Sequence, residues 1–134
     1  MSKMLYVNLP VKDLAAATRF YEAIGCQKNE SFSDHQSVSM VWSDTITFQL
    51  LTHEYFATFV RKPISDAHAT CASLFALTQE SRDAVDAIVA AAAGAGGKAD
   101  ARDPVDLGWL YNRAFEDVDG NVFEAIAADM SGAG

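Results

Sequence analysis

The stretch Ala114–Ile126, AFEDVDGNVFEAI, contains an acidic turn between two apolar runs. In the turn, Asp and Asn side chains can accept hydrogen bonds from nearby backbone N–H groups, and Gly120 can take the positive φ of a tight turn. The pattern therefore predicts a β-hairpin, with strands at about 108–115 and 121–126.

Glu124 lies inside the second strand of this hairpin, among residues that otherwise resemble a core. A carboxylate there costs free energy unless it is paired, solvated in a cleft or bound to a metal. Glu124 is therefore the first candidate catalytic residue, since a carboxylate in a pocket can act as a general base. The alternative is a structural Glu124 that pairs with Arg113 or Tyr111.

Tyr111 and Arg113 share one alternation phase on the preceding strand, and we expect both to face the same side as Glu124. Arg113 could then bind an anionic ligand through two parallel hydrogen bonds. A salt bridge between Arg113 and the acidic turn is the alternative.

The whole chain has 134 residues and a net charge of −8, with half of its residues apolar. Its length predicts a single domain over residues 1–134. The acidic balance argues against nucleic acid and against an anionic membrane surface as partners.

No apolar run approaches the roughly 20 residues of a membrane helix, and no signal peptide precedes the first strand. Cys26 and Cys71 have no partner at metal-site spacing, so we expect free thiols and a cytoplasmic location.

Periodicity predicts two modules with the same order of elements, a strand, a helix and three strands, at about residues 3–60 and 70–128. Asp13 and Ser81 are the expected N-caps of the two long helices, and Gly25 is the expected end of the first. A short helix or crossover is expected at 54–60, a linker at 62–68, and frayed residues from Met130 onward. The remaining expected strands are 4–11, 26–32, 37–42, 45–51, 71–77 and 98–101.

The opening motif Leu9–Leu14 (LPVKDL), with Arg19-Phe20-Tyr21 and Gly25, and the closing motif Glu116–Glu124 (EDVDGNVFE) carry a family resemblance. Together they resemble the vicinal oxygen chelate superfamily, which includes glyoxalase I, extradiol dioxygenases and bleomycin-resistance proteins. The resemblance implies an α+β fold, in which two βαβββ modules form a curved mixed sheet around a cleft. It also implies a homodimer.

The same resemblance implies where a metal would lie, because the family's metal enzymes place His or Glu ligands on the first and last strand of each module. The corresponding residues here are Tyr6, Gln49, Ser73 (within one residue) and Glu124. Only Glu124 matches the family's ligand types, with Gln49 as a weak ligand at best. The histidines, His35, His53 and His68, fall outside the expected strands, although His53 could reach the rim of the cleft.

Three hypotheses follow for function. The first is a small-molecule binding protein of the bleomycin-resistance type without a complete metal site, its cleft lined by Tyr6, Gln49, Tyr111, Arg113 and Glu124. The second is a metal-dependent lyase or dioxygenase, with Glu124 as a ligand of Zn, Ni, Mn or Fe. The third is a family member that acts through protein contacts alone. Whether the protein is an enzyme stays open at this level.

Overall fold

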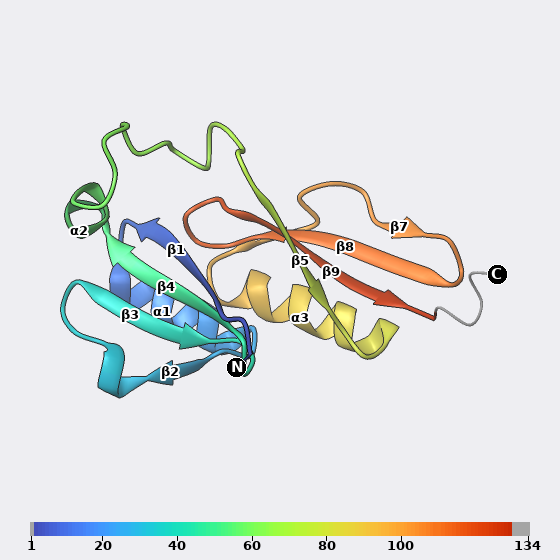
Figure 1. Ribbon diagram of the computed structural model, residues 1–134. Helices are drawn as coiled ribbons and strands as arrows, with labels where there is room; N and C mark the ends of the chain where they lie inside the picture. The colour runs from blue at the N-terminus through green and yellow to red at the C-terminus, as the bar shows by residue number, and fades with distance from the viewer. Residues whose placement is uncertain (1, 130–134) are drawn as a thin grey trace. The chain divides into compact units, whose positions relative to one another are not determined.

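A computed structural model describes residues 2–129 of the chain (Figure 1). The expectation about Met130 onward lies outside these residues. The chain divides into two compact units, Met1–Asp66 and Ala67–Gly134, and each is described by itself. Among the described residues, no helix is long and apolar enough to cross a membrane.

The first unit contains one mixed sheet, with strand order β1-β4-β3-β2. β1 runs parallel to β4, and the other neighbours are antiparallel. In chain order its elements are β1 (Leu5–Val11), α1 (Leu14–Ala23), β2 (Gln27–Asn29), the 3₁₀ helix η1 (Glu30–Phe32), β3 (Ser37–Val41), β4 (Ile46–Thr52) and α2 (His53–Ala57).

The second unit repeats this topology, with strand order β5-β9-β8-β6 and with β7 paired to β8. β5 runs parallel to β9, as β1 does to β4. Its elements are β5 (Leu74–Thr78), α3 (Arg82–Gly94), β6 (Lys98–Ala99), β7 (Val105–Asp106), β8 (Leu110–Glu116) and β9 (Val122–Ala128). The α+β class and the two βαβββ modules are thus confirmed.

Three elements differ from the sequence expectation. Residues 30–32 form a 3₁₀ helix rather than strand, because the Asn29 side chain accepts a hydrogen bond from the Ser31 backbone N–H and starts a turn. β5 begins at Leu74, three residues later than expected. β7, Val105–Asp106, was not expected, because two residues carry no periodicity to detect.

Both long helices begin where the sequence predicts. The Asp13 carboxylate accepts a hydrogen bond from Ala16 N at 3.1 Å, and the Ser81 hydroxyl accepts one from Ala84 N at 3.1 Å. Each helix then covers one face of its own sheet (Figure 1). The buried residues at these two interfaces include Phe20, Tyr21, Phe48 and Leu50 in the first unit and Val85, Val89, Phe115 and Phe123 in the second.

The turn of the β8–β9 hairpin, residues 117–121, forms as the sequence predicts. Asp117 Oδ1 accepts hydrogen bonds from the backbone N–H groups of Asp119 and Asn121, both at 2.9 Å. Gly120 has a φ of +93°, and a Cβ built on it would lie 2.6 Å from the backbone nitrogen of His68. Glycine is therefore required at this position for two reasons: its positive φ and the close approach of another backbone segment.

Candidate functional site

The side of the first sheet that faces away from α1 carries mainly polar side chains. Tyr6 pairs with Thr47, and Gln49 pairs with Asn8 and Ser39. Paired residues of neighbouring strands point to the same side, and alternate residues such as Phe48 and Leu50 point to α1. We call this side, with Tyr6, Asn8, Ser39, Thr47 and Gln49, the distal face of the first sheet.

A hollow of about 450 Å³ lies on this distal face. We call it the first-sheet hollow. It combines aromatic side chains with hydroxyl and amide groups. Its lining is Met4, Tyr6, Asn29, Phe32, Ser39, Val41, Ser43, Asp44, Thr47 and Gln49.

Two hydroxyls in the first-sheet hollow have no hydrogen-bond partner in the part of the chain that the structure describes. Ser39 and Thr47 are each only 4 % exposed, yet no hydrogen bond of either side chain is found among residues 2–129. Gln49 is held in place, because its Nε2 donates to Ser37 Oγ at 2.6 Å, which leaves its Oε1 as an acceptor. Sequence reasoning names Tyr6 and Gln49 as candidate ligand-binding residues but misses Ser39 and Thr47, because a single Ser or Thr in a strand carries no signal of its own.

Glu124 lies on the distal face of the second sheet, the side away from α3 that also carries Asn112 and Ala114. Its partner is Arg102, whose Nη2 donates to Glu124 Oε2 at 2.5 Å and to Asn112 Oδ1 at 2.8 Å. The Glu124 side chain is 18 % exposed and that of Arg102 is 38 % exposed. Glu124 is therefore a partly buried carboxylate that is already paired with the guanidinium group of Arg102.

Arg102 is the residue that sequence reasoning missed. It lies in the loop between β6 and β7, and its Nη1 donates to the backbone oxygen of Asp103 at 2.9 Å. The expectation that a structural Glu124 pairs with Arg113 or Tyr111 is wrong, because Arg102 takes that place. No local pattern marks an arginine in such a loop, so only the folded chain reveals the pair.

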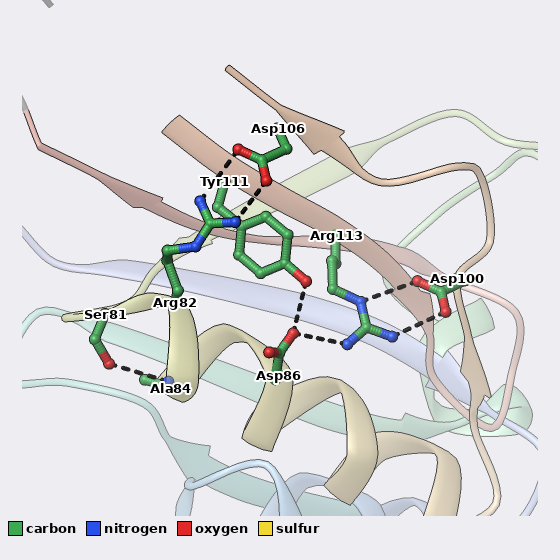
Figure 2. A network of polar contacts seen from close by, with 8 residues as sticks. All are labelled: Ser81, Arg82, Ala84, Asp86, Asp100, Asp106, Tyr111 and Arg113. Carbon is green, nitrogen blue, oxygen red and sulfur yellow. Dashed lines mark hydrogen bonds and ion pairs between the residues drawn. The ribbon is translucent and has the colours of Figure 1, made fainter. Parts of the chain in front are cut away.

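Tyr111 and Arg113 lie on the opposite face of the second sheet, toward α3 (Figure 2). The Tyr111 hydroxyl donates to Asp86 Oδ1 at 2.7 Å, and Arg113 Nη1 donates to the same oxygen at 2.9 Å. Arg113 also binds Asp100 with two nitrogens, at 3.0 and 2.8 Å. The prediction that Tyr111 and Arg113 face the same side as Glu124 is therefore wrong.

The register of the hairpin explains this correction. Glu124 pairs with Ala114, so the neighbouring residues of β8, Arg113 and Phe115, must point the other way. The predicted salt bridge between Arg113 and the acidic turn is replaced by the pairs with Asp86 and Asp100.

Hydrogen bonds in this network lower the pKa values of its carboxyl groups. The Tyr111 hydroxyl, and then Arg113, lower the pKa of Asp86. A bidentate pair with Arg82, and then the Gly108 N–H, lowers the pKa of Asp106 to about 2. The Arg82 guanidinium also lies 4.2 Å from the centre of the Tyr111 ring. The network ties α3 to β7 and β8 (Figure 2), which is a structural role.

The residues at the family's four metal positions do not fit a divalent metal. Leu74, rather than Ser73, is equivalent to Tyr6, because Leu74 pairs with Val122 two residues before Glu124, as Tyr6 pairs with Thr47 two residues before Gln49. The donor groups at these positions are then the Tyr6 phenol, the Gln49 amide and the Glu124 carboxylate, which is already bound to arginine. These groups are weak ligands for a divalent metal ion. Within residues 2–129, no three His, Cys, Asp or Glu side chains are grouped so that they could hold a metal. The first-sheet hollow is lined by none of the histidines.

Comparison with protein families identifies the fold. The family model described as Glyoxalase/Bleomycin resistance protein/Dioxygenase superfamily matches residues 3–125. The chain belongs to this superfamily. The resemblance noted in the sequence is thereby confirmed, and the two repeated modules are those of a glyoxalase/bleomycin resistance family protein.

Several solved structures share the fold at low sequence identity. A hypothetical protein from S. aureus has a TM-score of 0.79 and 23 % identity, over 96 % of this chain and 95 % of that one. A family enzyme from Burkholderia phytofirmans PsJN has a TM-score of 0.77 and 21 % identity, over 96 % and 100 %. The genomically encoded fosfomycin resistance protein from Listeria monocytogenes has a TM-score of 0.68 and 18 % identity, over 96 % and 93 %. No curated protein sequence matches the chain significantly.

Proposed function

We propose that this superfamily member binds a small molecule in the first-sheet hollow, without a complete catalytic metal site. The observation that carries the proposal is the pair Ser39 and Thr47, two nearly buried residues whose hydroxyls make no hydrogen bond within residues 2–129 and which line the hollow. A hydroxyl that lines a hollow and has no partner in the protein can bond a polar atom of a ligand or an ordered water molecule.

The size and lining of the hollow support the same proposal. About 450 Å³ lies within the range of roughly 300–1,000 Å³ typical of small-molecule pockets. Tyr6 and Phe32 are 56 % and 71 % exposed, and both line the hollow. Exposed aromatic rings beside fixed polar groups are the usual composition of a ligand site. Of the candidate ligand-binding residues, Tyr6 and Gln49 belong to this proposal, and Tyr111 and Arg113 do not.

The test is a small-molecule screen by thermal shift, followed by NMR mapping of the backbone amides. A ligand that binds only the folded protein raises its melting temperature, and we expect the shifted amides to include Ser39, Thr47 and Gln49. Thr47→Val removes the hydroxyl at nearly constant shape, and we expect it to weaken binding about three- to tenfold.

Thr78→Val is the matched control, because Thr78 is an exposed strand residue of the second unit. It should leave the affinity unchanged. A broad screen in which no compound shifts the amides of the hollow would refute the proposal. It would favour a family member that acts through protein contacts alone.

The second candidate is a metal-dependent lyase or dioxygenase with Glu124 as a metal ligand. Membership of a superfamily that often binds divalent metals favours it, and the Arg102–Glu124 pair argues against it. Calorimetric titration with Zn²⁺, Ni²⁺, Mn²⁺ and Fe²⁺ decides between the two candidates. One equivalent of tightly bound metal, lost in Glu124→Gln, would support the metalloenzyme and overturn the proposal of an incomplete metal site.

We also propose a homodimer in a reducing compartment such as the cytoplasm. β2 and β6 are edge strands of their sheets, and edges of this kind favour pairing with a second copy. Cys26 is buried, with its thiol pKa raised to about 12 by burial, and Cys71 is an exposed free thiol. Light scattering should give twice the 14.4 kDa of one chain. Labelling of Cys71 in freshly lysed cells should show a reduced thiol.

A further inference from the structure

We propose that the ligand of the first-sheet hollow is a cation, an amine attached to a flat apolar group. This inference rests on the proposed function and names the chemical class of the ligand. Three properties of the hollow point to it: its charge, its aromatic walls and the acceptors that remain in it.

The charge of the hollow comes from Asp44, which lies in the turn between β3 and β4 and is exposed. Asp44 makes no ion pair or hydrogen bond of its side chain among residues 2–129. None of the lining residues is Lys, Arg or His, so no cation of the hollow offsets this carboxylate. The net charge of −8 adds to the negative potential. An anionic ligand is therefore disfavoured here, and a cation is attracted.

The apolar walls are Met4, Tyr6 and Phe32, with exposed fractions of 50 %, 56 % and 71 %. A flat ligand that covers these side chains removes apolar surface from water, which favours binding. The faces of tyrosine and phenylalanine rings also attract ammonium groups through their quadrupoles. One ligand that is both flat and cationic uses both effects.

Several hydrogen-bond acceptors remain in the hollow beside its hydroxyl and amide donors. Gln49 Oε1 is left as an acceptor, because Gln49 Nε2 already donates to Ser37. The Ser39 and Thr47 hydroxyls each offer two lone pairs, and the Asp44 carboxylate accepts only. An ammonium group has three donors and no acceptor, so it can bond these acceptors. A carboxylate or a phosphate on the ligand is disfavoured by the charge of Asp44.

The experiment compares three probes that differ only in their terminal group: tryptamine, tryptophol and indole-3-propionate. Affinities are measured by NMR titration at pH 7 and low salt, with the amides of the first-sheet hollow as reporters. We expect tryptamine to bind about two- to fivefold tighter than tryptophol, as expected for one exposed ion pair, and indole-3-propionate to bind weakest. Added salt should lower the affinity for tryptamine and leave the affinity for tryptophol unchanged.

Asp44→Asn is the decisive variant, and we expect it to lower the affinity for tryptamine to that for tryptophol. Glu22→Gln is the matched control, since it changes the net charge equally but lies exposed on α1, across the sheet from the hollow. It should retain the preference for tryptamine.

The outcomes separate this inference from the proposed function. Equal affinities for the three probes, or the strongest binding by indole-3-propionate, would overturn the cationic class while leaving a binding function in place. A preference for tryptamine that survives Asp44→Asn would overturn the role given to Asp44. No shift at the hollow with any of the probes would overturn the inference. If the broad small-molecule screen also finds no compound that shifts these amides, the proposed function is overturned as well.

Discussion

Gly120→Ala tests why the β8–β9 turn needs glycine. The backbone at Gly120 has a φ of +93°, which a residue with a Cβ adopts at a cost of about 1–2 kcal/mol. The new Cβ would also lie 2.6 Å from His68 N and 2.7 Å from the carbonyl carbon of Ala67. Both are backbone atoms, so the clash can be relieved only by moving the 67–68 segment or the turn.

The magnitude follows from these two contributions. Relief of an overpacked contact costs about 1–3 kcal/mol, so the total loss for Gly120→Ala is about 2–5 kcal/mol. Gly108→Ala is the matched control, because Gly108 has a similar φ of +84° but no atom within 4 Å of a built Cβ. It should lose only the backbone contribution, about 1–2 kcal/mol.

Urea unfolding followed by circular dichroism measures both losses, provided that the slopes agree with that of the parent. The difference between the two variants isolates the contact with the 67–68 segment. If Gly120→Ala loses no more stability than Gly108→Ala, the close approach contributes nothing and the reasoning is wrong.

Three further predictions concern the second unit. Asp117→Ala removes the acceptor for two backbone N–H groups of the turn and should cost about 1–3 kcal/mol in urea unfolding, and an unchanged midpoint would contradict this. A double-mutant cycle on Arg102→Met and Glu124→Gln should give a coupling of about 0.5–1 kcal/mol, as for a partly exposed pair, and strict additivity would show that the pair contributes nothing. Because Arg82 lowers the pKa of Asp106 to about 2, the pair contributes stability above about pH 4 that is lost as the pH falls through 2. An NMR titration should find this low pKa, and Arg82→Met should return it toward its ordinary value.

Local signals in the sequence predicted much of the fold. The caps Asp13 and Ser81 and the hairpin turn depend on side chains that bond backbone groups a few residues away, so short stretches suffice to specify them. The family motifs fall in the same segments, which is why the superfamily was recognisable. The start of β5 was misplaced, because Cys71, Ala72 and Ser73 are as compatible with extended loop as with strand.

The faces of the strands were not predictable to the same degree. The turn at 117–121 fixes which residue of β8 pairs with Glu124, and a shift of one residue would replace Ala114 by Arg113 or Phe115. Tyr111 and Arg113 were therefore assigned to the wrong side of the sheet, although their strand was correctly expected.

The sequence by itself determined the α+β modules, their helix starts, the hairpin and the positions of Tyr6, Gln49 and Glu124 on their strands. Only the tertiary structure decided that Arg102, 22 residues away, binds Glu124. It also decided that Ser39 and Thr47 line the same hollow, where their hydroxyls have no partner among the described residues. The physical reason is that strand register and loop path bring distant side chains together, and neither is recorded in the spacing of residues along the chain. The stretch Ala114–Ile126 thus specifies a hairpin through contacts within itself, while the partner of its glutamate depends on the rest of the unit.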